Sequence, residues 1–321
     1  MTKVVVGIDL GGTYVRAGVF TAHGELVHTL QLPIEAHLGG AAGVQRIISL
    51  VEQVLKGATG ELVGIGFGST GPLDPLQGLI QNPYTLPGWE NVPVLQPLKD
   101  RFAVPAVLEN DADVAALGEY WAGAGQGAQR LFAVTVGTGI GTAYIYQGHI
   151  FRGLRNNHPE GGHHIIDPSG PLCYCGARGC WEALAAAPAI ALRARQAAQN
   201  QPGSLLWQLA EGDLDKIDAK LVATATRQGD PTASCVLDET ARYIGLGIMN
   251  IIALFLPEMI VLSGGVMKSA DLLLPRIRAL VDAHAAMHPV QQVKIVTASL
   301  GYHAGLYGAA YAILQSLVGR L

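Results

Sequence analysis

The sequence has 321 residues, of which only 14% are charged, against about 25% in a typical soluble domain, while 50% are hydrophobic. A spanning helix needs about 20 apolar residues, and the uncharged apolar stretch at residues 243–257 is shorter and contains Asn250. The hydrophobic fraction excludes disorder, and the net charge of -4 argues against nucleic acid as the main partner. We therefore expect a cytoplasmic globular protein of roughly two domains, without a signal peptide or a membrane partner.

The N-terminal segment alternates short strands with glycine-rich turns. Strands are predicted at residues 4–9, 15–21 and 26–30. The first strand ends in Asp9, and Gly11, Gly12 and Thr13 follow it. Glycines let backbone N–H groups approach an anion closely, and successive N–H groups in a turn form an anion-binding nest. The turn therefore predicts phosphate contacts, with Asp9 holding Mg²⁺ directly or through water, and a tight hairpin without a ligand is the alternative.

The next segment contains a candidate general base. The expected elements are a helix at residues 41–55, a strand at 62–67, mostly loop at 72–105 and a strand at 106–108. Asp111 follows Asn110 at the start of a helix that runs to about residue 121. A carboxylate at such a junction can either reach into a cleft or serve as a plain N-cap, and the residues alone leave both interpretations open.

The pattern of the N-terminus then recurs. Strands are predicted at residues 131–136, 142–146 and 149–151, and Gly137, Thr138 and Gly139 follow the first of them. Two copies of one supersecondary unit predict a duplicated fold with one copy in each domain. The second turn would form the facing half of a phosphate clamp, although hairpins with glycine turns are also common without a ligand.

Three of the four cysteines lie close together in the sequence. One residue separates Cys173 from Cys175, Cys180 follows, and His163 lies upstream. One His and three Cys make a closed tetrahedral Zn²⁺ set, typical of structural sites. Clustered thiols in a chain without an export signal indicate metal binding rather than a disulfide framework, with buried free thiols or a redox pair as alternatives.

The C-terminal part is expected to be mainly helical with inserted strands. The predicted elements are helices at residues 236–255 and 306–317 and strands at 259–262 and 293–298. Gly264 and Gly265 follow a strand, where backbone could pass close to a base or ribose, and a turn that starts a helix is the alternative. Cys235, alone on a helix, is expected in the core. Strands that alternate with helices indicate an α/β protein.

Several segments resemble the ROK family of sugar kinases and repressors, within the actin, hexokinase and heat-shock-protein ATPase superfamily. They are residues 9–13, 109–112, 136–141, 160–163 and 173–182. The resemblance implies an α/β, duplicated actin-like ATPase (ribonuclease H-like) fold with two domains around a cleft. Residues 1–116 would form the smaller domain, joined by the C-terminal helix at about 304–321, and residues 117–303 the larger one with a zinc-binding loop at 160–182. A homodimer or homotetramer is expected.

The resemblance also implies a reaction, the ATP-dependent phosphorylation of a hexose 6-hydroxyl with glucose as the first choice. Asp111 matches the family's catalytic base. The implied sugar-binding residues are Gly71, Thr85, Asn110, Asp111, Glu160, His163 and Glu182. The implied contacts of ATP and its Mg²⁺ are Asp9, Gly11, Gly12, Thr13, Gly137, Thr138, Gly139, Gly264 and Gly265. His163 would bind structural Zn²⁺ with Cys173, Cys175 and Cys180 through one ring nitrogen and face the sugar through the other.

Two residues depart from the family pattern. Thr85 stands before residues 86–89 where the family's glucokinases usually have Asn, and Asp113 stands where Asn is frequent. Because either could alter the choice of sugar, N-acetylmannosamine, mannose, fructose and allose stay as alternative acceptors, and polyphosphate stays as an alternative donor. A sugar-responsive repressor is a distant alternative, since the first strand begins at Val4 and leaves no room for a helix-turn-helix. A chaperone-like ATPase would lack the cysteine cluster.

Overall fold

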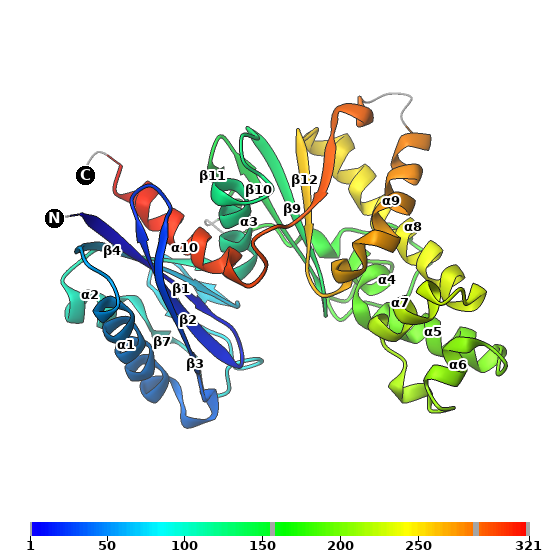
Figure 1. The fold of residues 1–321 in the computed structure, drawn as a ribbon, viewed down its shortest axis with the longest axis horizontal. Coiled ribbons are helices and arrows are strands. Elements are labelled where there is room, and N and C mark those ends of the chain that lie inside the picture. The colour runs from blue at the N-terminus through cyan, green and yellow to red at the C-terminus, as the bar shows by residue number, and fades with distance from the viewer. Residues whose placement is uncertain (1, 155–157, 285–288, 319–321) are drawn as a thin grey trace. The chain divides into compact units, whose positions relative to one another are not determined.

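The computed structural model describes residues 2–154, 158–284 and 289–318, which fold as two compact units (Figure 1). The first unit comprises Met1–Ala128, Ile145–Arg152 and Ala298–Leu321, and the second comprises Gln129–Tyr144 and Gly153–Thr297. The helix that begins at Asp111 lies wholly in the first unit. A boundary at residue 116, as expected from the sequence, would divide this helix.

The first unit is built on a five-stranded sheet in the order β3-β2-β1-β4-β8. These strands are β1 Lys3–Leu10, β2 Tyr14–Thr21, β3 Leu26–Pro33, β4 Glu61–Ser69 and β8 Ala106–Asn110. The helices of this unit are α1 Gly40–Lys56, α2 Leu95–Phe102, α3 Asp111–Ala122 and α10 Ala304–Ser316. Strands β1, β4 and β8 are parallel, so their carboxyl ends, including Leu10, Ser69 and Asn110, line one edge of the sheet. Open α/β sheets bind ligands at this edge.

Alternate residues of β1 face different helices, because successive side chains of a strand point to opposite faces. Val6 is buried in the core that contains α1, whereas Val5 is buried in a smaller cluster with α10. Gly7 lies on the α10 face, where a Cβ atom would stand 2.3 Å from the carbonyl oxygen of Leu306. Asp9, two residues further along, therefore faces α10 as well.

The second sheet repeats the first. Its order is β11-β10-β9-β12-β13, so each sheet places its third, second, first, fourth and fifth strands side by side in that order. The strands are β9 Arg130–Val136, β10 Ile140–Tyr146, β11 His149–Ile150, β12 Met259–Ser263 and β13 Lys294–Thr297. The helices of the second unit are α4 Trp181–Ala185, α5 Ala187–Asn200, α6 Leu205–Leu209, α7 Ala219–Arg227, α8 Pro231–Phe255 and α9 Ala270–Ala283. The shared strand order confirms the predicted duplication.

Three sequence-based expectations need correction. Residues 72–105 are more ordered than the expected loop, since they contain α2 and a small sheet of β5 Leu73–Asp74, β6 Leu79–Ile80 and β7 Val92–Pro93. Helix α8 begins at Pro231 rather than at residue 236, because the Asp230 carboxylate accepts the amides of Thr232 and Ala233 and caps it. Cys235 is exposed and does not lie in the core.

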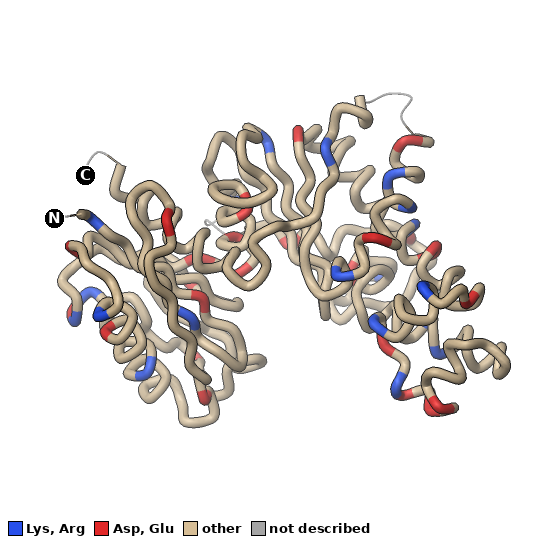
Figure 2. Tube along the Cα trace, viewed as in Figure 1, with Lys and Arg blue, Asp and Glu red and all other residues tan. Residues whose placement is uncertain are grey.

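Charged residues lie mainly in the helices and loops, and most residues of the strands are uncharged (Figure 2). The two sheets are therefore largely apolar, and most of their charges, such as Lys3, Asp9 and Arg130, lie at or next to strand ends. Among the described residues, no helix combines the length and apolar character that crossing a membrane requires.

Candidate functional site

The first glycine turn carries a carboxylate that is partly shielded from water. Gly11 N–H donates to the Tyr14 carbonyl at 3.0 Å and closes the turn. The Asp9 carboxylate accepts from Arg16 Nη1 at 3.1 Å. Gly305, at the start of α10, leaves room for it, because a Cβ atom there would lie 2.7 Å from Asp9 Cγ. Burial raises the pKa of Asp9, and the Arg16 guanidinium opposes this rise.

The same turn touches the loop that carries Thr85. A Cβ atom on Gly12 would lie 3.1 Å from the Thr85 carbonyl oxygen, so a larger residue would crowd this contact. The Thr85 hydroxyl accepts from Asn82 Nδ2 at 2.7 Å, and Thr85 N–H donates to Asn82 Oδ1 at 3.1 Å. Asn82 is fully buried. The buried amide thus fixes the position of Thr85, a role that the sequence did not reveal.

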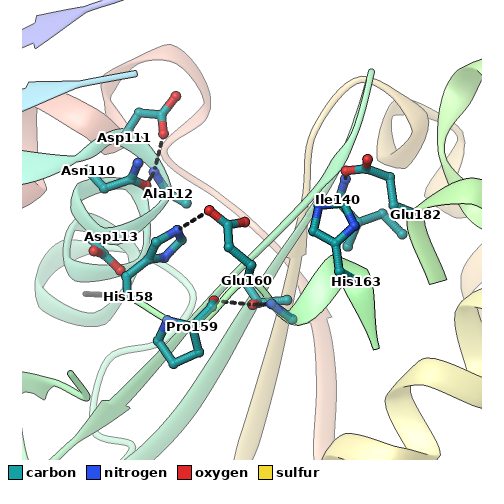
Figure 3. A network of polar contacts seen from close by, with 12 residues as sticks. Asn110, Asp111, Ala112, Asp113, Ile140, His158, Pro159, Glu160, His163 and Glu182 are labelled. Carbon is teal, nitrogen blue, oxygen red and sulfur yellow. Dashed lines mark hydrogen bonds and ion pairs between the residues drawn. The ribbon is translucent and has the colours of Figure 1, made fainter. Parts of the chain in front are cut away.

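The candidate base lies at the junction of β8 and α3. Asn110 is the N-cap of α3, and its side-chain oxygen accepts the amide of Ala112 at 2.9 Å. Asp111 Oδ1 accepts from the same amide at 2.8 Å, and the Asp111 residue is exposed (Figure 3). Gly71 lies near the Asn110 amide nitrogen, since a Cβ atom on Gly71 would be 3.2 Å from it. An acidic side chain is favourable at a helix N-terminus, where the helix dipole is positive.

A buried ion-pair network flanks this junction. Arg152 donates to Glu109 at the end of β8 and to Asp113 in the first turn of α3. The Asp113 side chain is fully buried, and that of Arg152 is 16% exposed. Burial raises the pKa of Glu109 to about 7, against the lowering effect of Arg152. Asp113 is therefore one member of an ion-pair network as well as a residue of the first helical turn.

The second glycine turn is tied to a candidate sugar ligand. Gly137 N–H donates to the Gly139 carbonyl at 2.9 Å, and the Glu182 carboxylate accepts the amide of Ile140 at 2.7 Å. A Cβ atom on Gly139 would lie 2.4 Å from Glu182 Oε2, so a larger residue there would push the Glu182 carboxylate away. Thr138 is exposed at the tip of the turn. One carboxylate thus joins the second glycine turn to the start of α4.

Gly264 and Gly265 lie beside the strand that leads to this turn. Gly264 has a φ of +94°, and a Cβ atom there would lie 2.3 Å from the Val136 carbonyl oxygen. Gly265 has open space around its Cα, and a short helical turn, Val266–Ser269, follows it. The turn therefore does start a short helix, as one of the two interpretations of the sequence expected. Gly265 is exposed, so a flat ligand could approach the backbone there.

The cysteine cluster comes together as a set of four metal-ligand side chains. His163, Cys173, Cys175 and Cys180 place one ligand atom each within 4.8 Å of one another. Cys175 Sγ lies 3.5 Å from Cys180 Sγ, and Cys173 Sγ lies 3.5 Å from His163 Nδ1. Tetrahedral Zn²⁺ with Zn–S bonds of about 2.3 Å separates its sulfur ligands by roughly 3.8 Å, so the donor set fits zinc. All four cysteines of the chain are free thiols.

The loop reaches this geometry through two glycines with positive φ. Gly176 has a φ of +92° and Gly179 one of +72°, which is the left-handed region that favours glycine. Gly176 N–H donates to the Cys173 carbonyl, which turns the chain back. His164, the neighbour of His163, is not part of the cluster; its ring lies 5.2 Å from that of Trp181.

Two aromatic side chains that contact candidate sugar ligands were not predicted as parts of the site. His158 Nε2 lies 3.1 Å from the Glu160 carboxylate (Figure 3), and this hydrogen bond is the main reason why the pKa of Glu160 is lowered. The Tyr174 hydroxyl lies 3.0 Å from His163 Nε2. Partial desolvation and the Glu182 carboxylate raise the pKa of Tyr174 to about 12. Only the position of Tyr174 between Cys173 and Cys175 could have drawn attention to it.

Comparison with known proteins places this arrangement in a family. The sequence model described as the ROK family matches residues 5–316. The glucokinase of Thermotoga maritima is 33% identical over 315 residues, which is 98% of each chain. The ROK hexokinase structure from Thermus thermophilus is 32% identical with a TM-score of 0.81, over 98% of this chain and 99% of that one. A ROK family glucokinase from Streptomyces griseus, solved with glucose and AMPPNP, is 33% identical with a TM-score of 0.76, over 97% of this chain and 99% of that one.

Xylose repressors are also related to this chain, at lower identity. The glucokinase and hexokinase similarities extend over nearly the whole chain. The protein belongs to the ROK family.

Proposed function

We propose that this protein is an ATP-dependent sugar kinase that transfers the γ-phosphate to the 6-hydroxyl of glucose. The observation that carries the proposal is the exposed Asp111 carboxylate, which stands at the same edge of the first sheet as the Asp9–Thr13 turn. A sugar kinase needs a base for the acceptor hydroxyl and a cradle for the phosphates. The glucokinase from Thermotoga maritima and the Streptomyces griseus complex with glucose and AMPPNP support glucose and ATP as substrates.

Asp111 would accept the proton of the sugar 6-hydroxyl as this oxygen attacks the γ-phosphorus. The bond from the γ-phosphorus to the bridging oxygen breaks, and ADP leaves. Asn110, whose oxygen is used by the helix cap, would present its amide N–H groups to a sugar oxygen. Asn82 holds Thr85 in place, and Gly71 leaves space beside Asn110. Both Thr85 and Gly71 would lie against the same side of the sugar.

The remaining sugar contacts would come from the second unit. Glu160 and Glu182 are carboxylates that can each accept from sugar hydroxyls, and His163 offers its Nε2. His158 holds Glu160 in its ionised, accepting form, because it is the main cause of the lowered pKa. The Ile140 amide fixes one oxygen of Glu182. These side chains would orient the hexose so that one hydroxyl meets the base.

The glycine turns would hold the nucleotide. Backbone N–H groups of Gly11–Thr13 and Gly137–Gly139 would bind phosphate oxygens, and Gly264 and Gly265 would lie against the nucleoside. Asp9 offers one carboxylate beside Arg16, which fits Mg²⁺ held through one carboxylate, water and substrate phosphates. Bound Mg²⁺ would neutralise charge on the phosphates during transfer.

Zinc would be structural. His163, Cys173, Cys175 and Cys180 supply a complete tetrahedral set, so a bound ion would have no open position for catalysis. Its role would be to fix the loop from which His163 and Glu182 reach the sugar. A cytoplasmic homodimer or homotetramer remains the expectation from the family resemblance.

A coupled assay of ADP release tests the proposal. Glucose, mannose, fructose, allose and N-acetylmannosamine are compared at equal concentration, with ATP or polyphosphate as donor. We expect glucose with ATP to give the highest kcat/KM. If none of the hexoses stimulates ADP release, the kinase assignment is refuted. A clear preference for N-acetylmannosamine would change the proposed acceptor from glucose to that sugar.

A further inference from the structure

We propose that the Tyr174 hydroxyl occupies, in the sugar-free protein, the place of a sugar hydroxyl between His163 and Glu182, so that hexose binding must displace this side chain. The inference rests on the proposed function, because it takes His163 and Glu182 as sugar ligands. It adds a residue that competes with the substrate from within the chain and sets its apparent affinity.

The contacts of Tyr174 are those that a bound sugar hydroxyl would make. Its oxygen lies 3.0 Å from His163 Nε2, and the Glu182 carboxylate is near enough to raise the pKa of the phenol. The charge of Glu160 also acts on this phenol. Three proposed sugar-binding side chains of the second unit thus act on one hydroxyl of the protein itself.

The protons of this group match those of a sugar complex. When His163 binds a metal through Nδ1, its Nε2 carries the proton and donates. The Tyr174 oxygen then accepts from His163 and keeps its own proton to donate, on the side where the Glu182 carboxylate acts on the phenol. A sugar hydroxyl has the same capacity, since it also combines one donor with acceptor lone pairs. Tyr174 and the hexose therefore compete for the same partners.

The Tyr174 side chain can leave without disturbing the metal loop. The residue is 82% exposed, so few apolar contacts hold its ring in place. Its ring meets that of His163 edge-on, with centroids 5.0 Å apart and an interplanar angle of 86°. Its backbone is fixed by the amide of Cys173, which donates to the Ala177 carbonyl at 2.8 Å. Rotation of the side chain alone would open the place and leave the three thiols where they are.

When an internal contact competes with a ligand, only the molecules in which that contact is broken can bind. The apparent Kd is then the intrinsic Kd divided by the fraction of such molecules. Removing only the hydroxyl, in Tyr174→Phe, should therefore tighten glucose binding. The sugar-free state of this variant loses one or two hydrogen bonds, so its Kd for glucose should be lower by about 3- to 10-fold. Zinc content should not change, because no ligand atom is altered. A tyrosine that stays and contacts the sugar would have the opposite effect.

Isothermal titration of the zinc-loaded full chain with glucose decides between these outcomes. Wild type, Tyr174→Phe and Tyr174→Ala are compared, with Tyr146→Phe on β10 as the matched control for the loss of a partly exposed phenol. The expected result is tighter binding by both Tyr174 variants and an unchanged Kd for the control. Unchanged or weaker binding by Tyr174→Phe would overturn the displacement while leaving the kinase assignment intact.

A second readout follows the side chain directly. In protein labelled with 3-fluorotyrosine, the ¹⁹F resonance absent from Tyr174→Phe is that of Tyr174. Glucose should shift it toward the position of a solvated tyrosine, and ATP alone should not. A resonance unmoved by saturating glucose would contradict the proposal. If the wild type and all variants bind no hexose by calorimetry, the proposed function falls, and the displacement falls with it.

Discussion

The two copies of the sheet have the same strand order and different strand ends. In the first copy, the penultimate residue of β1 is Asp9, which is paired with Arg16. In the second copy, β9 ends in uncharged residues, and the Thr135 hydroxyl lies 2.8 Å from that of Ser263 on β12. The positions are equivalent in topology, yet only the first carries a charge that suits a metal-bound phosphate.

The later strands differ in the same way. Strand β8 leads through Asn110 into α3 with Asp111 at its start, whereas β13 ends at Thr297 and is followed by uncharged residues. In the second copy, the chain after β11 forms the loop with the four metal-ligand side chains, and in the first copy β3 is followed closely by α1. The duplicated scaffold thus provides strand ends, and the residues that follow them place the candidate base in one copy and the cysteine cluster in the other.

The largest expected effect is the loss of zinc and of stability when one of the four metal-ligand side chains of the second copy is replaced. Cys180→Ser removes a buried ligand, and a structural Zn²⁺ contributes folding free energy directly. We expect loss of the single zinc per chain by elemental analysis and a clearly lower Tm. Cys235→Ser, which changes an exposed thiol on α8, is the matched control and should keep both. Zinc retained in Cys180→Ser would show that the four residues are not the ligand set.

The next largest effect is expected when the buried ion pairs of the first copy are broken, and it is a loss in the free energy of unfolding. Arg152→Met leaves Glu109 and Asp113 without their shared cation, and breaking a buried pair in this way typically costs about 3–5 kcal/mol. Arg101→Met breaks the exposed pair with Glu52 and should cost about 0–1 kcal/mol. Urea unfolding at neutral pH measures both. Equal losses in the two variants would contradict a structural role for the Arg152 network.

Glu109 should make stability depend on pH. Its pKa is about 7 in the folded chain and 4.5 ordinarily, so the folded state binds the proton more tightly. The stabilisation is complete below 4.5 and is lost as the pH rises through about 7, at up to about 1.4 kcal/mol per pH unit. Urea titrations between about pH 5 and pH 8 should show this slope in wild type and a smaller one in Glu109→Gln. Identical slopes would mean that Glu109 does not titrate in this range.

The smallest effect is expected at Thr85. Thr85→Ala removes the hydroxyl that Asn82 holds, and one hydrogen bond is worth about 0.5–1.5 kcal/mol, so the glucose KM should rise about 2- to 10-fold. Thr85→Ser keeps the hydroxyl and should restore most of the affinity. Steady-state kinetics over a range of glucose concentrations measures this. A KM unaffected in Thr85→Ala would remove Thr85 from the sugar site.

The sequence predicted the sheets well because their strands are short apolar runs that end at glycine turns. It predicted the duplication for the same reason, and it identified the cysteine cluster from its close spacing. Helix α2 escaped prediction because it lies in a segment interrupted by prolines and glycines. Arg152 could not be connected with Glu109 and Asp113, since about forty residues separate them and no periodicity links them. The contact of the Tyr174 hydroxyl with His163 could not be predicted either, because it depends on how the loop folds.

The assignment of the base to the first copy and of a sugar carboxylate to the second has one most direct test. Glucose affinity by calorimetry and single-turnover phosphoryl transfer are measured for Asp111→Asn and Glu182→Gln. We predict that Asp111→Asn binds glucose nearly as wild type does and transfers phosphate about 10²- to 10⁴-fold more slowly, whereas Glu182→Gln loses glucose affinity. Near-normal transfer by Asp111→Asn, with its fold intact, would contradict this account.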